Sequence, residues 1–403
     1  MAMLGIAALM AVPLSACSDD DDNDIYPVDS SSESDQEESI ATQTVIMFFP
    51  WTGNLLSAFN TNIADLATVV ENRGGLDEQR IVIYICQSQT SAHILEIVMG
   101  DDGCAALDTI ATETFSDAPY TTASGMAELL LNLEEYAPAE SYAMIIGCHG
   151  MGWLPAGTTV SAAAGTKGQT TGQLDLPTRY FGHSTDSSWQ CDISVLAAGI
   201  EATGVTMDYI LFDACYMANI ETAYELRDAT QLLIASPTEE MAAGVPYSVA
   251  GSYLLDMDTA GFCDAFTGYY LATSTPYAVM SVIDCSQTEA MAEVIREINT
   301  NCDGSVAASS LQAYDGLSPH LFYDLGDYAQ QLCSGDSSLS TSLDNALAAL
   351  VPYCRYTPKF YSAYNKSTSA ITTCSGITTS APSSNDAAAD WQLTQWAIDT
   401  AAQ

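Results

Sequence analysis

Basic residues are scarce in this chain. Only 9 of its 403 residues are Lys or Arg, against 51 Asp or Glu, so the formal net charge at pH 7 is −42. A nucleic-acid backbone would repel such a chain, and no nucleic-acid partner is expected. Hydrophobic residues nevertheless make up 48% of the sequence. That share is enough to bury a sizeable core, and it excludes disorder throughout.

Long apolar runs are also lacking. None reaches the roughly 18 to 20 residues that a membrane-spanning helix needs, and the best candidate lies at the start of the chain. The 12 cysteines form no CxxC pair and no His/Cys cluster with zinc spacing. We therefore expect neither an integral membrane protein nor a structural zinc site.

The N-terminal segment predicts export. Residues 1–16 read MAMLGIAALMAVPLSA, an apolar stretch that ends in small residues and is typical of a signal peptide. The following Cys17 completes the sequence LSAC, which resembles a bacterial lipobox and implies that Cys17 is lipidated.

An acidic segment follows this cysteine. Residues 18–39 contain ten carboxylates and no basic residue, so residues 17–43 are predicted to form a disordered tether. An acidic run in this place resembles the surface-export signal of lipoproteins in Bacteroidetes. We expect a lipid anchor in the bacterial outer membrane and a folded part at the cell surface, although a periplasmic face would give nearly the same sequence.

Strand and helix patterns alternate from residue 44 onward. Short β-branched or aromatic runs separated by helices of about 10 to 15 residues indicate βαβ units and a largely parallel sheet covered on both faces. The expected strands are 44–49, 81–87, 93–99, 141–150, 207–215 and 231–237, and the expected helices are 54–72, 124–137, 192–204 and 219–229. We predict a main domain over residues 44–250 and a C-terminal α+β subdomain over 251–403 packed on it.

Two strand ends carry polar groups suited to chemistry. His149-Gly150 follows YAMIIGC, and Asp213-Ala214-Cys215 follows YILF. Ligand sites in parallel sheets lie at the carboxyl ends of the strands, so neighbouring strands would bring imidazole and thiol together. Such a pair suits nucleophilic catalysis, because the imidazole helps form thiolate while turn N–H groups hold an oxyanion. We also expect Cys215 to begin a helix whose dipole lowers the thiol pKa.

The motifs HGMGW and DACYMANIETAYEL closely resemble the clostripain family of cysteine peptidases. Further agreement occurs at 235–248, at 323–329 and near 44–71. The resemblance implies an α/β, caspase-like three-layer sandwich with a mostly parallel central sheet between helices. It also implies a cysteine endopeptidase that cleaves peptide or protein substrates after Arg or Lys.

The same resemblance assigns roles to individual residues. His149 is the base or electrostatic partner, Cys215 is the nucleophile, and the backbone N–H groups of Gly150 and Cys215 form the oxyanion hole. Asp213 lies at the base of the specificity pocket. This chain has Ser-Pro-Thr at 236–238 where relatives often have Ser-Glu-Glu, which leaves Glu239 and Glu240 as candidate second carboxylates and the choice between Arg and Lys open.

Members of this family process themselves between the two catalytic positions. Lys167 and Arg179 are the basic residues of this interval, and they lie in a segment rich in Gly, Ser and Thr. We predict self-cleavage after Lys167, with Arg179 as a second candidate site.

Structural interpretations stand beside these functional ones. Taken alone, a His at a strand end or a Cys in an apolar context is more often structural, and Asp213 could cap the helix that follows it. An inactive surface lipoprotein that acts as an adhesin or binding module would explain the anchor, and another hydrolase or transpeptidase could use the same dyad. Ca²⁺ is a family-level possibility with no assigned ligands, although Asp101-Asp102-Gly103 offers hard oxygen ligands.

Overall fold

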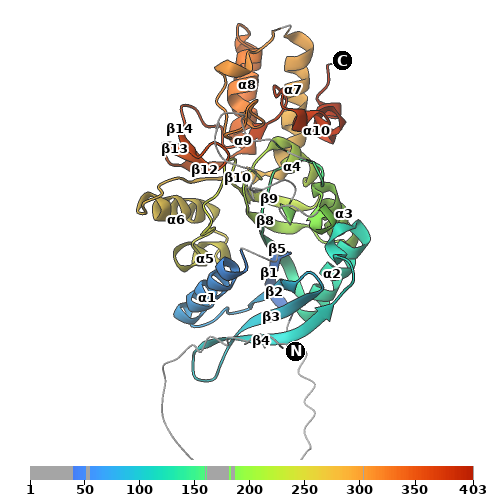
Figure 1. The fold of residues 1–403 in the computed structure, drawn as a ribbon, viewed down its shortest axis with the longest axis vertical. Coiled ribbons are helices and arrows are strands. Elements are labelled where there is room, and N and C mark those ends of the chain that lie inside the picture. Colours follow the sequence, from blue (N-terminus) through green and yellow to red (C-terminus); the bar gives the residue numbers. More distant parts are fainter. Residues whose placement is uncertain are drawn as a thin grey trace, which may run out of the picture. The chain divides into compact units, whose positions relative to one another are not determined.

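A nine-stranded sheet forms the centre of the molecule, in the order β12-β10-β9-β8-β5-β1-β2-β3-β4 (Figure 1). The computed structural model describes residues 40–50, 55–158, 160, 181–182, 187–302 and 304–402. The five central strands are mutually parallel: β1 (Ala41–Phe49), β2 (Gln79–Ser88), β5 (Ala139–Gly147), β8 (Met207–Asp213) and β9 (Thr230–Ala235). The outer strands are antiparallel: β3 (Ser91–Met99), β4 (Ala105–Thr114), β10 (Val279–Asp284) and β12 (Tyr353–Tyr356).

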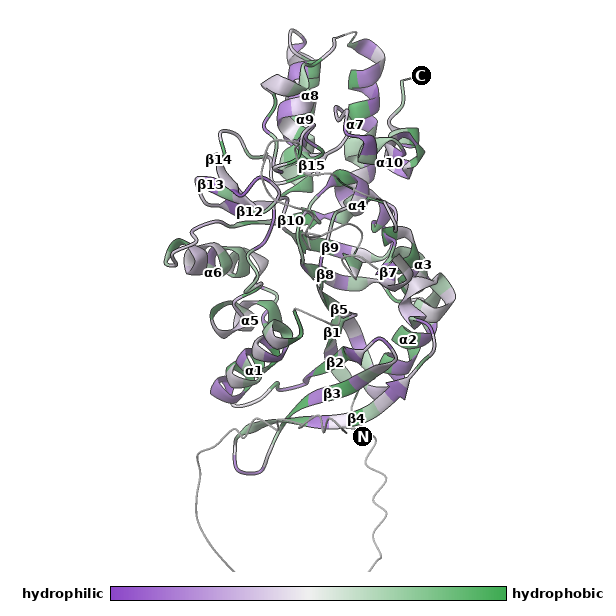
Figure 2. Ribbon diagram, in the orientation of Figure 1, coloured by the Kyte–Doolittle hydropathy of each residue, from purple (hydrophilic) through white to green (hydrophobic). Residues whose placement is uncertain are grey.

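The central strands are buried on both faces. Residues 45–49 of β1 and 209–212 of β8 have no exposed surface. Parallel strands covered by helices consist of such continuous apolar runs, because neither face meets water. Figure 2 shows the same arrangement, with hydrophobic strands inside and hydrophilic colour on the outer sides of the helices.

Helices cover both faces of the sheet. One group packs together on one side: α1 (Leu56–Arg73), α5 (Tyr247–Leu255) and α6 (Thr259–Leu271). On the other side lie α2 (Ala123–Tyr136) and α3 (Ile193–Thr203), followed by the short α4 (Ile220–Glu225) (Figure 1). The predicted sandwich with a mostly parallel central sheet is therefore confirmed.

The C-terminal part contributes to the same sheet and adds a helical layer. Strands β10 and β12 extend the sheet beyond β9, and residues 40–403 form one compact unit. The added helices are α7 (Thr288–Asn301), α8 (Leu325–Leu332), α9 (Ser337–Leu350) and α10 (Gln395–Asp399). Three two-stranded pairs complete the fold: β6 (Phe181–Gly182) with β7 (Gln190–Cys191), β11 (Tyr323–Asp324) with β15 (Thr378–Thr379), and β13 (Lys359–Ser362) with β14 (Ser367–Ala370). The sequence analysis divided the chain at residue 250. The hydrophobic core continues across that position.

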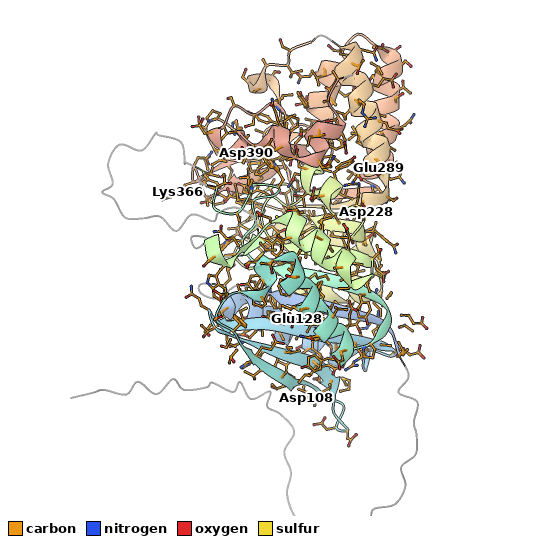
Figure 3. All side chains as sticks on the ribbon, turned by 90° about the vertical axis from the view of Figure 1, so that its right-hand side faces the viewer. Asp108, Glu128, Asp228, Glu289, Lys366 and Asp390 are labelled. Atoms are coloured by element: carbon orange, nitrogen blue, oxygen red, sulfur yellow. The ribbon has the colours of Figure 1, made fainter. Side chains whose placement is uncertain are left out.

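Acidic side chains extend over the outside of the molecule. Figure 3 labels exposed carboxylates from Asp108 on β4 to Asp390 near the C-terminus, with Glu128, Asp228 and Glu289 between them. A surface of one charge sign raises the local concentration of basic peptides. In the described part of the chain, no helix is both long and apolar enough to cross a membrane.

Candidate active site

Strands β5 and β8 are parallel neighbours, which is the condition under which the sequence analysis expected His149 and Cys215 to meet. Gly147 lies opposite Asp213 in their register. His149 and Cys215 each come two residues later, so both leave the sheet at the same level of its carboxyl edge. The sheet topology therefore brings together two residues that lie far apart in the sequence.

His149 and Cys215 line one cavity of about 310 Å³. Its walls also include Asp213, Glu240 and Phe59 of α1. The cavity is mostly apolar, with its polar groups concentrated around the thiol. A concave apolar site with a few convergent polar groups is the usual form of a substrate-binding site.

The glycines of HGMGW allow the two catalytic loops to touch. A Cβ atom on Gly150 would lie 2.5 Å from the carbonyl oxygen of Cys215. Gly152 has a φ of 62°, and its Cβ atom would lie 2.4 Å from the amide nitrogen of Asn219. Neither position can hold a side chain without displacing its neighbour. The motif thus keeps the turn after β5 in contact with the turn after β8.

The Cys215 thiol lies in a low-polarity, acidic environment. The backbone N–H of Glu240 donates to its Sγ atom at 3.3 Å. Burial raises the pKa of the Cys215 thiol well above its usual value, and the charges of Glu239 and Glu240 raise it further, while this N–H lowers it. This environment therefore disfavours the thiolate form of Cys215.

One expectation about Cys215 was wrong. The next helix, α4, begins at Ile220, and its N-cap is Asn219, whose side chain accepts from the Thr222 N–H. Cys215 lies in the turn before that helix, so a helix dipole does not lower its pKa. Sequence reasoning placed the helix correctly but extended it back to Cys215.

The residue after Cys215 has an unusual backbone conformation. Tyr216 has a φ of 61°, in the left-handed region. Its N–H donates to the Thr238 carbonyl at 3.0 Å, and its ring stacks on Phe322 with centroids 5.1 Å apart. Its hydroxyl donates to the Glu239 carboxylate at 2.6 Å. These contacts hold a conformation that a tyrosine would otherwise rarely adopt.

Glu239 has a full set of partners. Besides Tyr216, its carboxylate accepts from the Ser362 hydroxyl and from the Ala363 N–H, the latter at 2.8 Å. Its side chain therefore connects the turn after Cys215 to the hairpin β13–β14. Glu239 also lines the cavity, but its oxygens already accept three hydrogen bonds.

Asp213 points into the cavity region instead of capping a helix. It is 7% exposed, and its carboxylate accepts from the Val245 N–H at 3.0 Å and, at longer range, from Asn62 (3.4 Å) and Tyr247 (3.5 Å). Burial raises the pKa of Asp213 to about 6, against the opposing effect of the Val245 N–H.

Glu240 lies against Asp213, and among the described residues no group other than the Asp213 carboxyl is placed to share a proton with it. Both of its carboxyl oxygens are buried and lack a hydrogen-bond partner among the described residues. Burial, and next the charge of Asp213, raise the pKa of Glu240 well above its usual value. Two buried carboxyls this close cannot both ionise easily, so the pair favours a shared proton. A buried carboxyl pair without a cation is an environment suited to receive one.

The hairpin β13–β14 is a part of the site that sequence reasoning missed. Tyr361 of β13 and Ala363, which follows that strand, both line the cavity. Both strands are only four residues long, and the tail around them is rich in Ser and Thr, so the sequence does not reveal a cavity wall.

The other predicted site residues lie elsewhere or are not described. Lys167, Arg179 and Cys17 fall outside the described residues. The chain re-enters the described part at Phe181, and there the Gly182 N–H donates to the His149 carbonyl at 3.2 Å.

His93, His320 and the candidate cation ligands are not among the residues that line the cavity, and His183 falls outside the described residues. His93 lies within β3, and His320 pairs with Asp315 at 3.0 Å. Among the described residues, no group of three or more His, Cys, Asp or Glu side chains could hold a metal ion. Asp102, in the loop considered for Ca²⁺, instead accepts from the Cys104 N–H at 3.0 Å.

Comparisons with known proteins agree with this site. A sequence model of the clostripain family matches residues 51–393. A secreted C11 cysteine protease from Bacteroides thetaiotaomicron, "iotapain", is 39% identical, with a TM-score of 0.81 over 90% of this chain and 99% of that chain. A clostripain from the same organism, solved with a peptide inhibitor, is 42% identical, with a TM-score of 0.54 over 56% of this chain and 100% of that chain.

A more distant structure supports the fold alone. An inactive zymogen C11 protease from Parabacteroides distasonis is 23% identical and has a TM-score of 0.73 over 90% of this chain and 99% of that chain. No protein with a curated function matches the sequence. The family match spans most of the chain, and the solved relatives are caspase-like C11 proteases. The chain belongs to the clostripain family and is a cysteine peptidase.

Proposed function

We propose that this protein is an endopeptidase that cleaves after Arg or Lys through the dyad of His149 and Cys215. The observation that carries the proposal is the buried carboxyl pair, Asp213 and Glu240, in the same cavity as the thiol. A long cation would place its charge between these carboxyls and would satisfy the Glu240 oxygens. A neutral side chain would leave them unpaired, which a buried site penalises strongly.

The reaction proceeds through a thioester. Because burial keeps the thiol neutral, its proton passes to His149 as Sγ attacks the scissile carbonyl carbon. The backbone N–H groups of Gly150 and Cys215 stabilise the resulting oxyanion. His149 returns the proton to the leaving amine, and water then hydrolyses the thioester to release the acid and regenerate the thiol.

A solved relative supports the preference for a basic residue. The inhibitor bound to the Bacteroides thetaiotaomicron clostripain is BTN-VLTK-AOMK, in which K stands directly before the AOMK group. In this chain, Asp213 and Glu240 supply the negative charge that such a side chain needs. We assign no cation contact to Glu239, because Tyr216, Ser362 and Ala363 occupy its carboxylate.

Matched peptides test this specificity. Peptides with Arg, Lys, Asp or Ala before a reporter are incubated with the wild-type protein, Cys215→Ala, His149→Ala and the control Cys104→Ser. We expect turnover of the Arg or Lys peptides alone, lost by at least about 1,000-fold in the first two variants and retained in the control. Turnover of the Ala peptide at a similar rate would contradict the specificity. Absence of turnover in the wild-type protein would favour a binding module on an inactive scaffold.

We further propose self-cleavage after Lys167, with Arg179 as a second site. The support is the position of Gly182, whose backbone N–H donates a hydrogen bond to the His149 carbonyl. Gly182 follows Arg179 by three residues, so the chain just after the proposed cleavage sites runs beside the dyad. Intact mass of the wild-type protein should show two fragments that remain associated, and Cys215→Ala should stay whole. The same two fragments in a Lys167→Ala, Arg179→Ala double variant would contradict the assignment.

The proposed location is the outer face of a bacterial outer membrane, with a lipid on Cys17. A secreted relative and the signal-like residues 1–16 support export. Metabolic labelling with a fatty-acid analogue should mark the wild-type protein and not Cys17→Ser. External protease applied to intact cells then distinguishes the two faces of the membrane, since only a surface protein is accessible.

A further inference from the structure

Two cysteines meet at the base of the hairpin that forms a wall of the cavity. Cys354 lies in β12, opposite Ser281 of β10, and Cys374 lies in the turn before β15. Their Sγ atoms are 3.8 Å apart. Both residues are partly exposed, so a small oxidant can reach them. We propose that Cys354 and Cys374 form a disulfide in the exported protein.

The local chemistry favours this reaction. The Ser281 hydroxyl donates to the Cys354 Sγ at 3.3 Å. This bond and the contact with Cys374 stabilise the thiolate of Cys354, and the pKa of Cys354 is lowered as a result. A thiolate next to a second thiol is the arrangement that thiol–disulfide exchange requires.

The step balances with a disulfide donor as the oxidant. The Cys354 thiolate attacks the donor disulfide, forms a mixed disulfide and releases one donor thiolate. Cys374 then loses its proton and attacks the Cys354 sulfur of the mixed disulfide, which releases the second donor thiolate. Two cysteine thiols are oxidised, and one donor disulfide is reduced to two thiols.

The crosslink would close the chain segment that carries the cavity wall. Between the two cysteines run β13 and β14, with Tyr361 and Ala363 at the cavity. Beyond Cys374, the Thr378 N–H donates to the Ala218 carbonyl at 3.0 Å. Ala218 lies three residues after Cys215. A disulfide here would anchor the base of the hairpin. Glu239 holds the same hairpin at a second point, because its carboxylate accepts from the Ser362 hydroxyl. The inference concerns a covalent site outside the proposed reaction and does not depend on peptidase activity.

The scarcity of basic residues makes the test direct. Trypsin produces a fragment 297–355, which contains Cys302, Cys333 and Cys354, and a fragment 367–403, which contains Cys374 alone. The full chain is prepared as Cys215→Ala, exposed to oxidised glutathione, and treated with a thiol alkylator before non-reducing digestion. We expect the two fragments to be joined, with a mass 2 Da below their sum by loss of two hydrogens, and to separate after reduction.

Single replacements identify the partner in fragment 297–355. The joined species should disappear in Cys354→Ser and persist in the matched control Cys302→Ser. An alkylated or glutathione-bearing Cys374 in the unreplaced protein would overturn the proposal, and so would a link to Cys302 or Cys333. The oxidised protein should also melt about 5 °C above the reduced one, and this shift should be absent in Cys354→Ser. A crosslink without that shift would overturn its role in anchoring the hairpin.

Discussion

The hydroxyl of Tyr216 donates a 2.6 Å hydrogen bond to the carboxylate of Glu239, which also accepts from the hairpin β13–β14. One buried acid thus connects the residue after Cys215 to a wall of the cavity. Glu239 is 5% exposed, so water cannot replace a partner that is lost. This network holds Tyr216 in its left-handed conformation and sets the direction of the Cys215 backbone.

Replacement of Glu239 should therefore affect the chemical step. Glu239→Ala leaves three donors unpaired, two of them on the buried residues Tyr216 and Ser362, and we expect a loss of about 2 to 3 kcal/mol in the free energy of unfolding and at least a tenfold fall in kcat. Glu239→Gln keeps one acceptor oxygen and should recover part of both. Steady-state kinetics with urea unfolding measures the two quantities. An unchanged kcat in Glu239→Ala would show that the hydrogen bonds to Glu239 do not affect the chemical step.

The pH dependence of basic-substrate cleavage should follow the carboxyl pair. Burial raises the pKa of Asp213 to about 6, so this carboxyl is protonated below that pH and ionised above it. A cationic side chain needs the ionised form. We expect kcat/KM for Arg or Lys peptides to fall by about tenfold per pH unit below pH 6. A flat profile between pH 5 and pH 7 would show that Asp213 is ionised throughout that range.

Asp213→Asn should remove specificity and add stability. A folded-state pKa above the unfolded value means that ionisation at higher pH costs stability, and the cost grows from about pH 4 to pH 6. Near pH 8 we expect the variant to gain on the order of 1 to 2 kcal/mol in the free energy of unfolding. The gain should vanish below pH 4, where the wild-type carboxyl is protonated.

Kinetics completes the Asp213→Asn comparison. The kcat/KM for Arg peptides should fall by at least about 100-fold, because a neutral amide gives no charge to the cation. A variant that is less stable at both pH values would show that the hydrogen bond from Val245 outweighs the cost of burying the charge.

Gly150→Ala tests the contact between the catalytic loops. The added Cβ atom would lie 2.5 Å from the Cys215 carbonyl oxygen and 2.8 Å from the Met217 sulfur, so the two turns must separate. We expect at least a tenfold loss in kcat and a destabilisation of about 1 to 3 kcal/mol. Gly268→Ala is the matched control, since that helical position has no atom within 4 Å of the added Cβ. Equal kcat values in the two variants would show that catalysis does not depend on the contact between the two loops.

The central sheet was predictable because its strands are uninterrupted apolar runs between amphipathic helices. The elements that the sequence analysis missed, β4 and α5, lack this contrast between apolar strands and amphipathic helices. Strand β4 is a largely exposed edge strand rich in Thr, and α5 is a short apolar helix next to the Gly- and Pro-containing segment 244–246. Both depend on neighbours for their burial, so the local pattern could not identify them.

His149, Cys215 and Asp213 could be found in the sequence because each follows an apolar strand and the carboxyl ends of parallel strands share an edge. The order of the strands, the pairing of Asp213 with Glu240 and the separate role of Glu239 came only from the tertiary structure. Glu239 and Glu240 are adjacent and chemically alike, yet one accepts three donors and the other none among the described residues. Sequence pattern fixes which residue types a strand end presents, whereas long-range packing decides which atoms surround them. For Glu239, two of the three donors come from a hairpin more than 100 residues further along the chain.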